Sequence, residues 1–296
     1  MRLPDSTRLP SLRSLGIPLE TTPEAFGEFR DSSDDRDDMT ALRRRLAEDG
    51  YLLLRALLDP DIVAQAQREA VESLAARGLV SRSSDRLAVR GACVSTSGFE
   101  SEGRRFPSAR RLALAGRMSK FYARFLDTEV RAFDHLWMRF MAPGQATGPH
   151  CDIVYMGRGT TELYTSWIPL TAVTLADGPL LILEHSHHIE RLRSGYGRMD
   201  IDKNNNWRRV RFRHGRLFRG GDYSRDPRRL RREFSLRWLT SEFDPSDVVI
   251  FTPYVMHGSL DNLSKRFRIS VDARYQRAAD PIDERWIGDH PIGHSR

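Results

Sequence analysis

Residues 148–155 read Gly-Pro-His-Cys-Asp-Ile-Val-Tyr, which places two side chains able to bind a metal, His150 and Asp152, in an apolar, β-branched run. Such a run predicts a β-strand. Because residues i and i+2 of a strand point to the same face, the imidazole and the carboxylate are expected to converge, with Cys151 pointing away. An isolated His-x-Asp pair is common by chance, so a metal site also needs support from the rest of the chain.

A second histidine, His257, stands about a hundred residues later, after the strand-like run 248–251. Two histidines and one carboxylate with open coordination positions form the ligand set of non-haem Fe(II) oxygenases. His150, Asp152 and His257 match that set in kind.

The composition is that of a soluble globular protein, with 40% hydrophobic and 29% charged residues in 296. No apolar run approaches the ~18 residues of a membrane span, and the N-terminus lacks the apolar core of a signal peptide. Two cysteines, Cys93 and Cys151, are too few for a disulfide framework, which favours a reducing cytoplasm. We therefore expect a cytoplasmic protein without a membrane partner.

The net charge of +7 raises the alternative of a nucleic-acid-binding protein. Only Lys120, Lys203 and Lys265 are lysines, so nearly all of the 47 basic residues are arginine. This imbalance is typical of a GC-rich genome, and no recognised nucleic-acid motif is present. We expect no nucleic-acid partner.

The chain divides into three parts on composition. Residues 1–38 form a polar N-terminal extension, with an acidic run at 31–38 that favours solvent. Residues 39–280 form a single domain that contains a long insertion at 189–245, and residues 281–296 form a C-terminal tail.

Several short strands follow an initial helical region. Helices are predicted at 39–50, with Gly50 as the C-terminal cap, from Asp59 as N-cap to Gly78, and over 108–128. Strands are predicted at 51–55, 130–141, 163–170, 178–183 and 248–251. This order indicates a mostly β protein with flanking helices, built on a jelly-roll core of two antiparallel sheets.

Four segments resemble the phytanoyl-CoA dioxygenase family of Fe(II)/2-oxoglutarate-dependent oxygenases. They are LAEDGYLLLRALLDPDIV (46–63), MAPGQATGPHCD (141–152), SWIPLTAVTLADGPLLILEHSHH (166–188) and DVVIFTPYVMHGSLDNLSKRFRISVDARYQ (247–276). They occur in the order of the family, whose core is a double-stranded β-helix. One departure is the pair Glu184-His185, where the family usually has Pro-Gly.

The resemblance implies a role for individual residues. His150, Asp152 and His257 would be the iron ligands, and Arg268 would bind the distal carboxylate of 2-oxoglutarate. An arginine presents a planar fork that matches a carboxylate. Other positions would line the co-substrate site, namely Ser270 on the same strand face as Arg268, Ser259, Trp167 and Met138.

The implied activity is an Fe(II)-, 2-oxoglutarate- and O2-dependent hydroxylation of a small molecule, in natural product biosynthesis. Halogenation would require the carboxylate ligand to be missing, whereas Asp152 is present. A non-catalytic jelly-roll protein that binds a metal or an anion is the alternative. The substrate, the oligomeric state, and the choice among hydroxylation, desaturation and ring formation stay open.

The 189–245 insertion is too rich in large apolar residues to be a simple disordered loop, and we expect it to cover the barrel mouth as a substrate lid. Its arginines favour an anionic substrate, although codon bias also explains them. The candidate substrate residues are Trp207, Arg208, Arg211 and His185. For the cluster of His185, His187 and His188, capping at the surface is the competing role.

Overall fold

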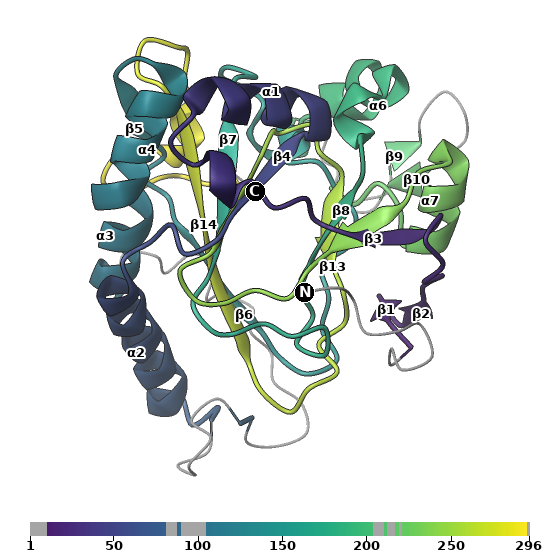
Figure 1. The fold of residues 1–296 in the computed structure, drawn as a ribbon, viewed down its shortest axis with the longest axis horizontal. Coiled ribbons are helices and arrows are strands. Elements are labelled where there is room, and N and C mark those ends of the chain that lie inside the picture. Colours follow the sequence, from purple (N-terminus) through teal and green to yellow (C-terminus); the bar gives the residue numbers. More distant parts are fainter. Residues whose placement is uncertain are drawn as a thin grey trace.

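The computed structural model describes residues 11–80, 88–89, 105–203, 210–211, 217–218 and 221–294. Its centre is built from ten strands: β3 (Phe26–Glu28), β4 (Tyr51–Leu54), β5 (Val130–Ala132), β6 (Trp137–Met141), β7 (Tyr164–Pro169), β8 (Leu180–Leu183), β11 (Trp238–Thr240), β12 (Val248–Phe251), β13 (His257–Ser259) and β14 (Arg268–Arg277). The major sheet has the order β4-β12-β7-β14-β5, with β6 also paired to β14. The minor sheet has the order β13-β8-β11-β3 and faces it (Figure 1), which confirms the predicted double-stranded β-helix.

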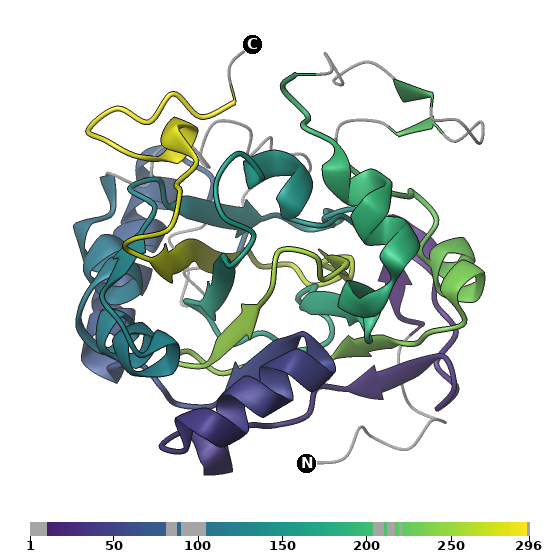
Figure 2. The same cartoon turned by 90° about the horizontal axis from the view of Figure 1, so that it is seen from above.

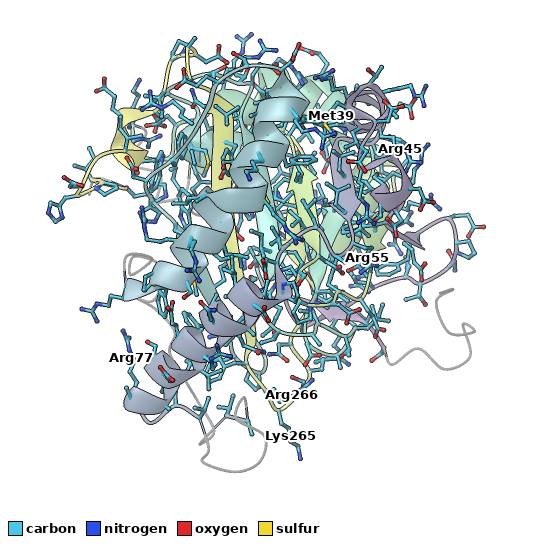
Figure 3. The ribbon with its side chains drawn as sticks, turned by 60° about the vertical axis from the view of Figure 1, so that its left-hand side comes forward. Met39, Arg45, Arg55, Arg77, Lys265 and Arg266 are labelled. Atoms are coloured by element: carbon cyan, nitrogen blue, oxygen red, sulfur yellow. The ribbon has the colours of Figure 1, made fainter. Side chains whose placement is uncertain are left out.

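Helices cover the outer face of the major sheet (Figures 1 and 3). They are α1 (Met39–Asp49), α2 (Pro60–Ala76), α3 (Pro107–Leu114) and α4 (Gly116–Leu126). Their apolar faces share one core with every second residue of β14, from Ile269 to Tyr275. In Figure 3, Arg77 after α2 and Lys265 on the loop before β14 mark the end of the molecule at which β14 begins.

A second core fills the space between the sheets. It joins Leu53, Trp167 and Val249 of the major sheet to Ile182 and Leu239 of the minor sheet. On the outer side of the minor sheet lie α6 (Glu190–Ser194) and α7 (Pro227–Phe234), opposite to α2–α4 (Figure 2). Among the described residues, no helix is long and apolar enough to cross a membrane.

The predicted helix boundaries at α1 and α2 are confirmed by their caps. Gly50 ends α1 in the left-handed conformation, and its N–H donates to the carbonyl of Leu46. Asp59 accepts a hydrogen bond from the backbone N–H of Asp61, with Pro60 at the first helical position. These contacts satisfy backbone groups that the helix itself leaves unpaired.

Two predicted elements are each divided in the structure. The helix expected over 108–128 breaks between α3 and α4, where Ala115 is extended and Gly116 has a φ of +58°. The strand expected over 130–141 splits into β5 and β6. The apolar pattern continues across both breaks, so periodicity alone did not reveal them.

The N-terminal segment 1–38, the expected insertion 189–245 and the tail 281–296 contribute more to the sheets and the core than their composition predicted. The segment expected to be a polar extension contributes β3, which pairs in parallel with β11, and it buries Leu12 and Phe29. β11 itself belongs to the range expected to be an insertion and pairs with β8 in the minor sheet. In the C-terminal tail, Trp286 is buried. A few large apolar side chains hold these segments despite their polar surroundings.

Gly50 and Gly78 allow a matched test of helix termination. Both have positive φ, but a Cβ on Gly50 would lie 2.5 Å from Nδ1 of His187, whereas nothing lies within 4 Å of one on Gly78. We expect Gly78→Ala to lower the free energy of unfolding by about 1 kcal/mol through strain alone, and Gly50→Ala by about 1–3 kcal/mol more through overpacking. Urea denaturation measures both, and equal losses would contradict the steric role of His187.

Candidate functional site

A pair of backbone hydrogen bonds brings the two histidines together. The N–H of His150 donates to the carbonyl of His257, and the N–H of His257 donates to the carbonyl of His150, both at 2.9 Å. The expectation that His150 and Asp152 share a strand face is wrong. His150 sits on an isolated bridge, while Asp152 has helical dihedral angles and precedes the short helix α5 (Ile153–Met156). The bridge and this helical turn together produce the convergence that a strand pleat was expected to give.

The three side chains converge on one point. Oδ1 of Asp152 lies 3.7 Å from Nε2 of His150 and 3.7 Å from Nε2 of His257. One potential ligand atom from each residue lies within 4.8 Å of the others, and all three residues are buried. Two ligands about 2.1 Å from a metal and at right angles would be about 3 Å apart, so a small contraction would complete a metal site.

The hydrogen bonds of the histidines point their free nitrogens at this centre. Nδ1 of His150 lies 2.8 Å from the carbonyl of Gly148, and Nδ1 of His257 lies 3.0 Å from the carbonyl of Val255. A carbonyl only accepts, so each Nδ1 carries the proton and each Nε2 presents a lone pair. Burial lowers the pKa of both imidazoles, that of His150 to about 4, so both are neutral at pH 7 and able to bind a metal.

Asp152 is held as an ionised carboxylate with one oxygen directed to the histidines. Its Oδ2 accepts hydrogen bonds from Oγ1 of Thr165 at 2.5 Å and from Nη2 of Arg274 at 2.9 Å. Burial by itself raises the pKa of Asp152, but Arg274, the two imidazoles and the Thr165 hydrogen bond outweigh it and hold that pKa well below its usual value. The donor set therefore fits a divalent metal such as Fe(II).

A row of buried polar side chains on β14 faces the space between the sheets. Arg268, Ser270, Asp272 and Arg274 occupy every second position. Within the described chain, Nε of Arg268, Oγ of Ser270, Oδ1 of Asp272, and Nε and Nη1 of Arg274 have no hydrogen-bond partner. Buried polar atoms are rarely left unpaired, so this row fits a polar ligand between the sheets.

Arg268 lies where a carboxylate of that ligand could be bound. It is only 3% exposed, and its guanidinium carbon is 5.8 Å from the ring centre of Trp167. Burial, with a smaller effect of Arg139, lowers the pKa of Arg268 to about 10, so the side chain stays charged at neutral pH. The structure thus brings Arg268, Ser270 and Trp167 to one side of the major sheet.

The two remaining predicted co-substrate residues, Ser259 and Met138, differ in the location of their side chains. Ser259 is buried on β13, and its Oγ accepts a hydrogen bond from the N–H of Thr147 at 2.9 Å. Met138 packs among the helices on the outer face of the major sheet, so its side chain points away from Arg268. The prediction that the Met138 side chain lines the co-substrate site is therefore wrong, because β6 places Trp137 and Arg139 on the inner face instead.

The candidate substrate residues are not assembled at this centre. His185 is exposed and its Nδ1 lies 3.1 Å from the carbonyl of Glu48, while Nε2 of His187 lies 3.1 Å from that of Ala47. These contacts cap the last turn of α1, the alternative role named for this cluster. Trp207, Arg208 and the side chain of Arg211 lie outside the described residues.

Sequence reasoning missed the two residues that hold Asp152. Arg274 continues the alternation of Arg268, Ser270 and Asp272, with apolar residues between them, so its inward direction could have been read from the strand period. Thr165 carries no such signal except its place two residues before Trp167 on the same strand.

Known proteins resemble this chain in sequence and in fold. The sequence model of the phytanoyl-CoA dioxygenase (PhyH) family matches residues 46–270. A 1-deoxypentalenic acid 11-beta-hydroxylase from Streptomyces arenae is 28% identical over an alignment of 280 residues, which covers 86% of this chain and 87% of that protein.

Two solved structures share the fold at low sequence identity. EctD from S. alaskensis with 2-oxoglutarate and 5-hydroxyectoine has a TM-score of 0.57 and 16% identity, covering 98% of this chain and 92% of that one. The epimerase SnoN with Fe3+, alpha ketoglutarate and nogalamycin RO has a TM-score of 0.56 and 18% identity, covering 84% and 87%. The matched family model spans most of the chain, including all three converging side chains, and the chain therefore belongs to the phytanoyl-CoA dioxygenase family.

Proposed function

We propose that His150, Asp152 and His257 hold the iron of an enzyme that hydroxylates a small molecule in natural product biosynthesis. Membership of its family makes the chain an Fe(II)- and 2-oxoglutarate-dependent oxygenase. The observation that carries the residue assignment is the convergence of two neutral imidazoles and one ionised carboxylate on a buried point. Three protein ligands leave open positions on an octahedral metal.

We further propose that Arg268 binds the distal carboxylate of 2-oxoglutarate. Its buried guanidinium has an unpaired Nε, Ser270 lies two residues further along the same face, and Trp167 supplies an apolar wall. When bound, Fe(II), 2-oxoglutarate and O2 supply the oxidation of a C–H bond, with release of succinate and carbon dioxide. The residues of the chain orient the co-substrate and, through the apolar core between the sheets, keep water away.

Thr165 and Arg274 are positioning residues in this proposal. Both bind Oδ2 of Asp152, which leaves Oδ1 as the ligand oxygen. Hydroxylation as the outcome is supported by the relative from Streptomyces arenae, which is named for hydroxylating 1-deoxypentalenic acid. The lid role of 189–245 and the substrate roles of Trp207, Arg208, Arg211 and His185 stay predictions.

The first test is anaerobic and concerns the binding of Fe(II) and 2-oxoglutarate. Fe(II) and 2-oxoglutarate added anaerobically to the protein should give a weak visible charge-transfer band, which His257→Ala should abolish. On admission of O2, 1-deoxypentalenic acid and metabolite extracts are then screened for substrate-dependent succinate formation. Absence of the band in the intact protein would contradict the proposed site.

For Arg268, we expect Arg268→Ala to raise the KM for 2-oxoglutarate. Loss of a charge-assisted, bidentate contact of about 2–3 kcal/mol corresponds to an increase in KM of roughly 30- to 160-fold. Arg268→Lys should recover only part of this loss, because an ammonium cannot reproduce the planar fork. Steady-state kinetics and Fe(II) titration separate the effects, and an unchanged KM with Ala would remove Arg268 from the co-substrate site.

For Thr165, we expect Thr165→Val to weaken Fe(II) binding by about tenfold or more, as partners of metal ligands commonly do. The change keeps the shape of the side chain but removes the hydroxyl that binds Asp152. Thr165→Ser keeps the hydroxyl and is the matched control, with nearly normal affinity. Equal Fe(II) affinities of the Val and Ser variants would show that the hydrogen bond does not position Asp152.

A further inference from the structure

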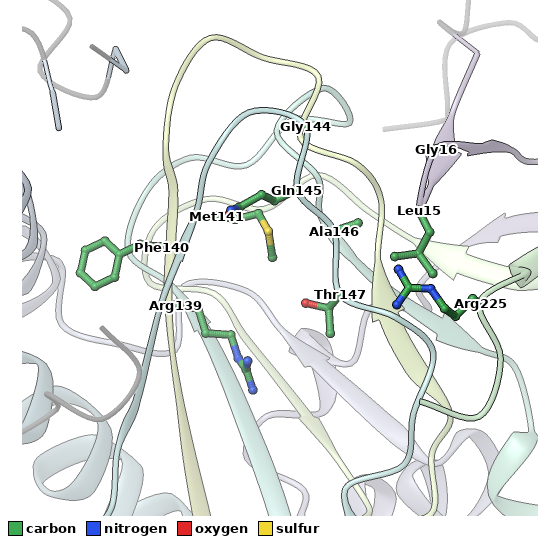
Figure 4. Close-up of a pocket in the computed structure, with 10 residues that line it drawn as sticks. All are labelled: Leu15, Gly16, Arg139, Phe140, Met141, Gly144, Gln145, Ala146, Thr147 and Arg225. Atoms are coloured by element: carbon green, nitrogen blue, oxygen red, sulfur yellow. The ribbon is translucent and has the colours of Figure 1, made fainter. Parts of the chain in front are cut away.

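A cavity of about 690 Å³ is lined in part by residues 144–147, the segment that leads to His150 of the candidate metal centre. Two arginines line it from different elements, Arg139 of β6 and Arg225 of the segment before α7. Figure 4 shows their guanidinium groups directed into the same space from opposite sides, with Thr147 between them. The volume lies in the range of about 300–1,000 Å³ that is usual for small-molecule sites.

Both walls of this cavity are tied to the metal-binding segments. The N–H of Thr147 donates to Oγ of Ser259, which follows His257 by two residues. On the other side, the N–H of Tyr223 donates at 2.8 Å to the carbonyl of Pro149, the residue before His150. Arg225 follows Tyr223 by two residues. The same two hydrogen bonds therefore link both sides of the cavity to the segments that carry His150 and His257.

The remaining wall comes from the hairpin of β1 (Arg13–Ser14) and β2 (Ile17–Pro18). Oγ of Ser14 donates to the carbonyl of Ser259 at 2.8 Å, which fastens this hairpin to β13. Its turn residue Leu15 has a φ of +55°, rare for a non-glycine residue, and lines the cavity. Leu15 and Met141 thus add apolar surface beside the two arginines.

The charges of the interior favour an anion here. Arg139, Arg268 and Arg274 face two aspartates, Asp152 and Asp272, and Nε of Arg139 donates to Oδ2 of Asp272 at 2.6 Å. The two positive charges of Fe(II) and the two negative charges of 2-oxoglutarate cancel. These five side chains leave one positive charge when both are bound, which Asp222 beside Gly148 and His150 offsets, and the exposed Arg225 supplies a positive charge at the cavity itself.

We propose that this cavity binds an anionic group, a carboxylate or a phosphate, of the primary substrate, with the hydrocarbon part of the substrate against Leu15 and Met141. This inference rests on the proposed function and assigns the substrate class of the same site. The other source of such an anion is 2-oxoglutarate itself. Arg268 already serves that molecule in the proposal, and a cavity this large exceeds the needs of a short dicarboxylate.

Arg225 is the residue to change, because removing Arg139 would leave Asp272 without its partner. The probes are alicyclic carboxylic acids such as adamantane-1-carboxylate, each paired with its neutral carboxamide. Their binding to the anaerobic Fe(II)·2-oxoglutarate complex is measured by calorimetry. One charge-assisted contact with the anion should make the intact protein bind the acid about tenfold or more tightly than the amide. Arg225→Gln removes this contact and should abolish most of the preference.

Two control variants accompany it. Arg229→Gln changes another exposed arginine, four residues away on α7 and outside the lining, and should keep the full preference. Arg225→Lys keeps the charge and should retain part of it. Equal losses in Arg225→Gln and Arg229→Gln would reduce the effect to general surface charge and overturn the site.

The remaining outcomes separate this inference from the proposed function. No preference for the acid in any pair would overturn the anionic substrate class, while an intact charge-transfer band would still support the iron site. Displacement of 2-oxoglutarate by the acids would assign the cavity to the co-substrate and overturn the substrate assignment. A missing band with preserved acid preference would count against the iron assignment alone.

Discussion

The reciprocal hydrogen bonds between the backbones of His150 and His257 are the contact on which the site depends. They join two segments about a hundred residues apart and place both imidazoles on one side of the bridge. The pairing of β13 with β8, in which His257 lies opposite Ile182, fixes which way the second imidazole points. A slip of one residue would turn His257 to the other face of the minor sheet. A third bond, from the N–H of Ile153 to the carbonyl of Pro253, holds the turn that contains Asp152.

The second constraint is the burial of charge on one face of β14. The outer face of this strand is apolar and packs against the helices, whereas the inner face carries Arg268, Asp272 and Arg274. Charges in such a position are costly unless each is paired. Arg274 is paired with Asp152, and Asp272 with Arg139, but several of their polar atoms remain without partners among the described residues. A divalent metal and a dicarboxylate would complete these pairings, which links the stability of the barrel to its ligands.

The sequence predicted the elements with local signals well. The caps at Asp59 and Gly50 and the apolar strands of both sheets follow from short-range rules. The strand face at β6 was harder, because Trp137, Met138 and Phe140 are all apolar, and only Arg139 among them indicates which positions face inward. Met138 was accordingly assigned to the wrong face.

Other features depended on long-range contacts that no local pattern encodes. Asp152 reaches the histidines through a helical turn, although its β-branched neighbours predicted a strand. β3 is ordered by its pairing with β11, more than two hundred residues away in sequence. Arg274 shows the intermediate case, since its face follows from the strand period but its contact with Asp152 does not.

The central claim is that two imidazoles and one carboxylate bind the iron. X-ray absorption spectroscopy of the anaerobic Fe(II)-loaded protein tests it directly, because imidazole rings give characteristic outer-shell scattering. We expect two histidine ligands with nitrogen and oxygen donors only, and one histidine fewer in His150→Ala. A spectrum without histidine scattering, or with a sulfur donor such as the neighbouring Cys151, would contradict the assignment.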